Sequence, residues 1–304
     1  MKTILSLIIG AGCVFAAHAQ YFSAPPDADA FVRAAPGATN LNYGAAGALA
    51  VSGPIALNGL SVSNGSFDTF IRFNMAALPV SFNSAFGPNN WVVTHAVLQL
   101  TEQAAPANNL FNRGVGAFQV RWIAKTNWTE GTGTPAAPTM DGISYTNEAT
   151  LLNSNTDEVL GTYTNSGANQ TEFFYLTMPS GFINTVKAGG EVDLYLTAIS
   201  PGIGFTFDSK EFITNSDWPF LAIAGEPQTG ITGTSRSGKN ITLNCTNGAS
   251  GETYFVITST NVTLPLGQWT PVATNRLTAS GNFSITVTNG VAGSSRQFFA
   301  IQAQ

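Results

Sequence analysis

The chain has 304 residues, of which 44% are hydrophobic and only 10% are charged. This composition allows two domains with cores of their own and excludes a disordered chain, which would be rich in charge and poor in apolar residues. The formal net charge of −5 excludes the positive surface field that binding to nucleic acid or to an anionic membrane surface requires.

The first 19 residues have the pattern of an export signal. Lys2 precedes an apolar stretch at residues 4–17, and Ala17-His18-Ala19 has the small-residue pattern of a cleavage site. The apolar stretch is too short for a membrane span, which needs about 20 residues. We therefore expect residues 1–19 to be a signal peptide and the protein to be secreted, extracellular or at the cell surface, with no membrane insertion after cleavage.

Cleavage would leave Cys245 as the only cysteine and His95 as the only histidine. No intramolecular disulfide is then possible, so we expect apolar cores to supply the stability. One histidine and one cysteine also make a zinc site or a serine triad hard to build. Carboxylates are scattered along the chain without a recognisable glycosidase pattern. We therefore expect no catalytic activity.

Residues 20–225 have the alternation of a β-protein. In residues 67–75 every second position, from Phe67 to Met75, has a side chain suited to a core, and residues 118–122 show the same period. Each run implies a strand with one buried face. Further strands are predicted at residues 30–34, 48–52, 93–100, 171–178, 191–199, 203–208 and 220–224. A helix is predicted only at residues 180–187, with Ser180 as its N-cap. Strands so short and numerous predict an all-β sandwich or jelly roll.

Pro227 and Gly230 interrupt this patterning, so we place a linker at residues 226–230. A second set of strands follows it, at residues 240–245, 253–260, 268–274, 282–287 and 296–303. These strands predict a smaller β-sandwich over residues 231–304, with Cys245 and Trp269 in its core. This part resembles the immunoglobulin-like and fibronectin type III-like modules that are often appended to large secreted bacterial proteins.

Several segments of the first domain carry a further resemblance. In chain order they are Asp-Ala-Asp-Ala-Phe-Val-Arg at 27–33, Thr-Asn-Leu-Asn-Tyr-Gly at 39–44, Phe-Asp-Thr-Phe-Ile-Arg-Phe at 67–73 with Leu-Pro at 78–79, residues 93–100 and 120–128, Thr-Glu-Gly-Thr at 129–132, Phe-Asp-Ser-Lys-Glu at 207–211 and Pro-Phe-Leu-Ala-Ile at 219–223. Together they resemble the DNRLRE-type secreted domain over residues 27–224. Two departures are Lys210, where the family usually has Arg, and residues 136–169, which find no counterpart.

Some members of that family are carbohydrate-binding modules with a jelly-roll fold, so the resemblance implies a polysaccharide or a cell-surface glycan as the partner. Sugar recognition uses aromatic rings beneath pyranose faces and polar side chains that bond the hydroxyls. The candidate ligand-binding residues are Tyr43, Arg72, Trp128 and Trp218. Each also has a structural alternative, as a ring packed in a turn or core or as a strand residue at the surface.

Calcium is the expected cofactor, if there is one. Asp27 and Asp29 lie in the first strand of the resemblance, and Asp208 and Glu211 precede its last strand, so four carboxylates would meet where these strands lie together. Carboxylates are the ligands that Ca²⁺ prefers. The alternative is an ion pair of Glu211 with Arg33 or Arg72.

The sequence thus predicts a secreted, two-domain, all-β protein that binds carbohydrate without catalysis. The alternative is a structural or adhesive protein of a cell surface or matrix, in which the sandwiches act as spacers or contacts and bind no sugar.

Overall fold

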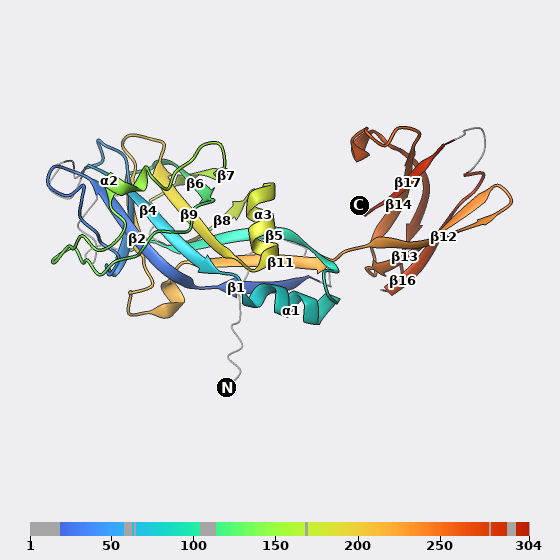
Figure 1. Cartoon of the computed structure of the whole chain (residues 1–304), viewed down its shortest axis with the longest axis horizontal. Helices are drawn as coiled ribbons and strands as arrows, with labels where there is room; N and C mark the ends of the chain where they lie inside the picture. The colour runs from blue at the N-terminus through green and yellow to red at the C-terminus, as the bar shows by residue number, and fades with distance from the viewer. Residues whose placement is uncertain are drawn as a thin grey trace. The chain divides into compact units, whose positions relative to one another are not determined.

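The computed structural model (Figure 1) describes residues 19–57, 63, 65–103, 114–167, 170–279, 281–290 and 296–303. The expected signal peptide, apart from Ala19, lies outside these residues. Two compact units are present, Gln20–Gly225 and a second that contains Glu226–Gln304. Strands make up 51% of the structure and helices 11%, so the predicted all-β class is confirmed.

The first unit is a sandwich of two sheets. The four-stranded sheet has the order β1 (Gln20–Ala24), β11 (Phe220–Pro227), β5 (Trp91–Thr101), β8 (Thr171–Leu176). The seven-stranded sheet has the order β10 (Gly204–Asp208), β3 (Ala48–Ser52), β4 (Ser66–Asn74), β9 (Glu191–Ala198), β6 (Gly116–Ile123), β7 (Glu158–Asn165), and β2 (Pro26–Ala34) also pairs with β4. β4 is therefore the strand through which β2, β3 and β9 are joined.

The main core lies between the two sheets, as the alternation in β4 predicts. Phe67, Ile71 and Phe73 of β4 are at most 1% exposed and pack with residues of β5, β8 and β11. Burial of each such side chain contributes about 1.5–3 kcal/mol, and this core holds the unit together without a disulfide.

The opposite face of the seven-stranded sheet is buried as well, which differs from the prediction of one buried face. Phe70 of β4 and Tyr195 of β9 point to this face and pack against Trp128, Ile143 and Leu151. These three belong to the connection between β6 and β7, residues 124–157, which we call the covering segment. The alternation of residues within a strand predicts which face is apolar. It does not show that a segment distant in the chain covers the opposite face as well.

Three α-helices and two short 3₁₀ helices accompany the strands in the residues that the structure describes. They are α1 (Ala77–Phe86), α2 (Tyr145–Glu148), α3 (Ser180–Ala188), η1 (Asn215–Asp217) and η2 (Leu266–Gln268). None of these helices is long and apolar enough to cross a bilayer. Figure 1 shows α1 beside β1 and α3 beside β9.

The prediction of a single helix was incomplete, because α1 and the four-residue α2 were missed. Pro79 is the third residue of α1, and a proline in the first turn removes no hydrogen bond, since those N–H groups have no partner within the helix. α3 was found, but Pro179 occupies the N-cap position and Ser180 is the first helical residue. Gly189, with a φ of +70°, ends α3 in the left-handed conformation that favours glycine.

The second unit is a smaller sandwich of two three-stranded sheets. Their orders are β12 (Gly230–Ser237), β13 (Asn240–Gly248), β16 (Gly281–Val287) and β15 (Thr270–Arg276), β14 (Thr253–Ser259), β17 (Phe298–Ala303). Leu243, Val256 and Ile285 lie in its core, together with Cys245, which is 2% exposed and whose pKa is raised by burial. Trp269 is also buried. Only Gln228 and Thr229 separate β11 from β12, so the strands extend into the expected linker.

Candidate functional site

Asn42 fixes the covering segment to the loop at residues 39–44. Its fully buried amide donates to the carbonyl oxygens of Glu130 at 2.6 Å and Ile143 at 2.9 Å. Its Oδ1 accepts from the backbone N–H groups of Gly44 and Gly133 at 3.0 and 3.1 Å. Four backbone groups are thus satisfied by one side chain, and two motifs that lie about 90 residues apart in the chain are brought together.

Glycine at position 131 is required by this arrangement. Gly131 has a φ of +82°, and a Cβ there would lie 2.2 Å from the Asn42 Oδ1 atom. Any other residue would be strained and would displace the Asn42 amide. The turn after Glu130 therefore needs glycine because the Asn42 side chain lies directly against the Gly131 backbone.

Trp128 holds the start of the covering segment against the sheet. Its ring packs on Phe70 with the centroids 5.8 Å apart, and its Nε1 donates to Asp193 Oδ1 at 2.7 Å. The Arg72 guanidinium carbon lies 4.7 Å from the ring centroid. With 6% of its surface exposed, Trp128 is mainly an anchor and offers only a small part of its ring to solvent.

Arg72 directs its donors to the protein. Its Nε donates to Asp193 Oδ1 at 2.9 Å, and its Nη2 donates to the carbonyl oxygens of Thr126 and Trp128. The Arg72 side chain is 12% exposed. Burial raises the pKa of Asp193 to about 6, although the neighbouring Arg72 lowers it. Arg72, which was predicted to bind sugar, thus connects the sheet to the covering segment through its hydrogen bonds.

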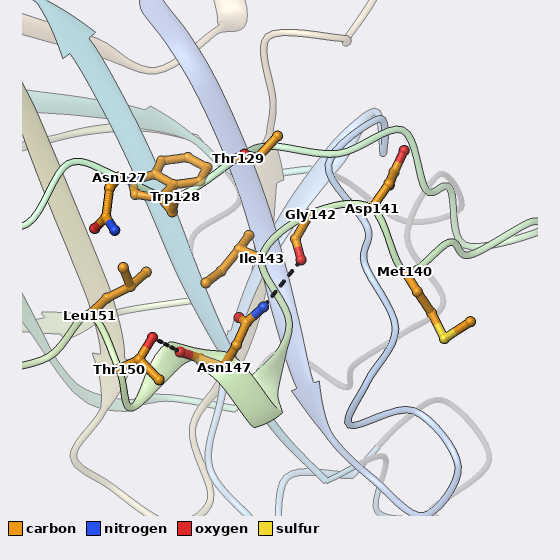
Figure 2. A pocket seen from close by; sticks show the side chains of 10 residues that line it. All are labelled: Asn127, Trp128, Thr129, Met140, Asp141, Gly142, Ile143, Asn147, Thr150 and Leu151. Carbon is orange, nitrogen blue, oxygen red and sulfur yellow. Dashed lines mark hydrogen bonds between the residues drawn. The ribbon is translucent and has the colours of Figure 1, made fainter.

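The covering segment forms a pocket of about 330 Å³ (Figure 2). Asn127 and Asn147 bring amides to it, and Thr129 and Thr150 bring hydroxyls. Its other lining residues are Trp128, Met140, Asp141, Gly142, Ile143 and Leu151. Figure 2 shows Asn147 and Thr150 on the α2 side of the pocket and Asn127 and Trp128 on the side across from them. The lining is thus more polar than apolar, which suits a hydroxyl-rich ligand better than an apolar one.

Asp141 is the one ionisable residue in this lining. Its Oδ1 accepts from Thr139 Oγ1 at 2.6 Å and from the Thr132 N–H at 3.0 Å, and its Oδ2 accepts from Thr132 Oγ1 at 2.7 Å. These donors lower the pKa of Asp141 to about 2. The carboxylate is therefore ionised at neutral and mildly acidic pH.

Two further carboxyl groups, one in the covering segment and one in the sheet beneath it, lie outside the pocket lining. Glu148, on α2, is 7% exposed, and its Oε2 has no hydrogen-bond partner among the described residues. Burial, together with the nearby Asp68 of β4, raises the pKa of Glu148 to about 8. Burial also raises the pKa of Asp68 to about 6, against hydrogen bonds from Thr197 and Tyr195. Glu148 is therefore mostly protonated at neutral pH.

A cluster of acidic side chains that could hold a metal ion lies beside Asn42. It consists of Asp29 on β2, Glu130 in the covering segment and Glu211 after β10, each offering one oxygen within 4.8 Å of the others. The Lys210 ammonium lies among them, 3.0 Å from Glu130 Oε1 and paired with Glu211.

Asp29 is the buried member of this acidic cluster. It is fully buried, and its Oδ1 has no hydrogen-bond partner in the described structure, whereas its Oδ2 accepts from the Lys210 N–H at 2.8 Å. Burial and the charges of Glu211 and Glu130 raise its pKa well above the ordinary value. A cation added to the cluster would reverse this effect.

Asp29 and Glu211 are thus the two expected calcium ligands that the fold brings together. Asp27 is exposed, because β2 has a register shift between Pro26 and Ala28 that disturbs the alternation of its faces. Asp208 is buried elsewhere, with a hydrogen bond from Gln103 and a pKa raised to about 6 by burial. Glu130 was missed as a ligand, although it lies in the Thr-Glu-Gly-Thr segment.

Tyr43 and Trp218 do not line the pocket. Tyr43 is 6% exposed and stacks on Phe31, with ring centroids 4.6 Å apart. Trp218 is half-buried, and its Nε1 donates to the Phe212 carbonyl oxygen at 2.8 Å, which closes the loop after β10. Of the four expected ligand-binding residues, Trp128 is the one that the fold places in the pocket wall.

Comparison with known proteins gives little guidance. No protein-family model matches the sequence, and no curated protein matches it. One similar solved structure is a β-D-glucuronidase from Dictyoglomus thermophilum, with 7% sequence identity and a TM-score of 0.26. The alignment covers 95% of this chain and 44% of the glucuronidase chain, so this chain spans less than half the length of that protein.

Proposed function

We propose that this protein is a secreted, non-catalytic carbohydrate-binding protein, and that the pocket of the covering segment receives a polysaccharide or cell-surface glycan. The observation that carries the proposal is the lining of that pocket, where the side chains of Asn127 and Thr129 are exposed beside apolar side chains, whereas those of Asn147 and Thr150 hydrogen-bond to the protein. Amides and hydroxyls bond the hydroxyls of a sugar, and apolar side chains contact its C–H faces. The resemblance to the DNRLRE-type domain, stated above from sequence motifs, supports the same class of ligand.

The distribution of carboxyl groups supports binding without hydrolysis. Glycoside hydrolysis generally uses two carboxyl groups that flank the scissile bond. Asp141 is the one such group in the pocket lining, and Glu148 is buried beneath it next to Asp68. A second carboxyl group is thus lacking among the ten residues that line the pocket.

A glycan array on residues 20–304, followed by calorimetry on any ligand found, tests the proposal. Asn127 lines the pocket and is exposed, so Asn127→Ala removes an amide with little structural effect. We expect this substitution to weaken binding about tenfold, the cost of one hydrogen bond to a sugar. Asn155→Ala, an exposed change outside the pocket, is the matched control. Absence of any ligand, or equal effects of the two variants, would count against this function.

We also propose that the cluster of Asp29, Glu130 and Glu211 binds calcium. Hard oxygen ligands from three separate segments suit Ca²⁺, and the buried Asp29 Oδ1 lacks a partner that a cation would supply. Lys210 would have to move aside, since its ammonium is paired with two of the three carboxylates.

A structural or adhesive role is the second candidate, favoured by an exposed aromatic pair. Phe173 and Tyr175 are 48% and 51% exposed on β8, the last strand of the four-stranded sheet. Exposed apolar side chains that lie together on one face mark contact surfaces. This candidate predicts that Phe173→Ser with Tyr175→Ser abolishes association with a surface or matrix while any glycan binding persists.

A further inference from the structure

The pocket carries a single fixed charge. Asp141 is exposed, but three donors from Thr132 and Thr139 hold its two oxygens in place. The carboxylate therefore has a defined position relative to the amides of Asn127 and Asn147, unlike a surface aspartate that moves freely in solvent. A fixed charge discriminates between ligands better than a mobile one, because no ordering entropy is lost when a ligand binds.

The cations nearest to this pocket have partners in the protein. The Lys125 ammonium donates to the carbonyl oxygen of Thr150. Arg72, which lies over the Trp128 ring, is paired with Asp193 and Glu191. No lysine or arginine is among the ten lining residues, and the whole chain has a net charge of −5. Asp141 is therefore the one charged group on the lining itself, and the Lys125 ammonium, whose partner is a neutral carbonyl, adds a positive charge just outside the lining at Thr150.

We propose that this pocket selects its glycan by charge, with Asp141 as the selecting residue: it prefers sugars that carry a protonated amine, accepts neutral sugars and rejects uronates. This inference rests on the proposed carbohydrate-binding function and names its ligand class. An ammonium group gains a charge-assisted hydrogen bond with the carboxylate, a hydroxyl gains a weaker one, and a uronate carboxylate is repelled.

Three oligomers with the same β-1,4-linked glucose-type backbone test the order of preference. They are a neutral glucose hexamer, a glucosamine hexamer and a glucuronate hexamer. Calorimetry in mildly acidic, low-salt buffer, in which the glucosamine amines are protonated, measures the three affinities on residues 20–304. We expect the glucosamine hexamer to bind about tenfold more tightly than the neutral hexamer, and the glucuronate hexamer to bind about tenfold more weakly.

Salt provides a check that needs no variant. Because the carboxylate is exposed, raising the ionic strength from about 0.01 to 1 M shortens the screening length from about 30 to 3 Å, and the three affinities should converge. Asp141→Asn, which removes the charge, should make them converge at low salt also. Thr139→Val, which removes one donor but leaves the charge, should preserve the order of preference.

The outcomes separate this inference from the function on which it rests. If the neutral hexamer binds and Asn127→Ala weakens it, but the three hexamers bind equally or the glucuronate binds best, charge selection is wrong and the pocket still binds sugar. Discrimination that persists in Asp141→Asn at low salt also overturns the role of Asp141. If none of the three hexamers binds, both the function and the inference fail for this backbone.

Discussion

The guanidinium carbon of Arg72 lies 4.7 Å from the centroid of the Trp128 ring, and both side chains bond the same oxygen, Asp193 Oδ1. Arg72 is on β4, Asp193 is on β9 and Trp128 lies near the start of the covering segment. These three side chains therefore join the sheet to the segment that forms the pocket.

Arg72→Ala should destabilise the first unit by about 3 kcal/mol, because it leaves the buried Asp193 carboxylate without its counter-ion. Arg72→Lys keeps the charge but not the planar group that lies over Trp128, so it should cost about half as much. Urea unfolding followed by tryptophan fluorescence measures both. Arg236→Ala, an exposed change in the second unit, is the control. A loss below about 1 kcal/mol would mean that the pair is a surface contact of little weight.

The pKa of Glu148 predicts that the first unit loses stability as the pH rises. Its folded pKa of about 8 exceeds the ordinary value of 4.5, so the folded state favours the protonated form. The contribution is complete below pH 4.5 and is lost as the pH rises towards 8. A pKa difference of this size, reduced for partial solvent screening, corresponds to about 2 kcal/mol.

Glu148→Gln separates this effect from those of its neighbours. Asp68 and Asp193 have pKa values of about 6, so their contributions are lost between the ordinary value of 3.8 and pH 6. Because the Glu148 contribution is lost from pH 4.5 to about 8, we expect the variant to show a shallower decline of the melting temperature below pH 6 and to lose the decline between pH 6 and 8. An unchanged profile above pH 6 would show that Glu148 is ionised already in the native protein.

How far the sequence predicts the fold can be seen in two strands. The run that became β4 was predicted to within one residue, because its alternation follows the period of a strand. β7 was missed, since Gly161 and two threonines hide its alternation, and it is stabilised by pairing with β6 about 40 residues earlier. Local periodicity does not record such a long-range pairing.

The candidate site was less predictable than the fold. Trp128 was expected because an aromatic ring in a loop suits the face of a pyranose, but Asn127 and Asn147 do not stand out in a chain so rich in asparagine. The covering segment has no regular period, so nothing local shows that it folds back over β4. Its position depends on long-range contacts, among them the buried amide of Asn42, which brings it to the loop at residues 39–44, and the contacts of Trp128 with Arg72 and Asp193.

Calcium should stabilise the first unit if the acidic cluster binds it. At a hundredfold excess of Ca²⁺ over its dissociation constant, the gain is about 2.7 kcal/mol. Scanning calorimetry with calcium and with EDTA measures this gain.

Glu130→Gln should abolish this gain, and Asp27→Asn, at an exposed carboxylate outside the cluster, should not. Lys210→Gln distinguishes a metal site from an ion-pair network. If the cluster is a metal site, loss of the competing ammonium should tighten calcium binding. Equal melting temperatures in calcium and EDTA would leave the cluster as an ion-pair network.

Asn42→Ala should release the covering segment without unfolding the sheets. The substitution leaves the N–H groups of Gly44 and Gly133 and the carbonyl oxygens of Glu130 and Ile143 without partners, at about 1–3 kcal/mol for each group that stays buried. Detachment of the segment avoids this cost, so limited proteolysis should cut between residues 129 and 143 in the variant and not in the parent protein. Asn40→Ala, an exposed change in the same loop, should leave the segment protected. Because this segment forms the pocket, Asn42→Ala should also abolish glycan binding. A segment that stays protected from proteolysis in the variant would contradict the role given to the Asn42 amide.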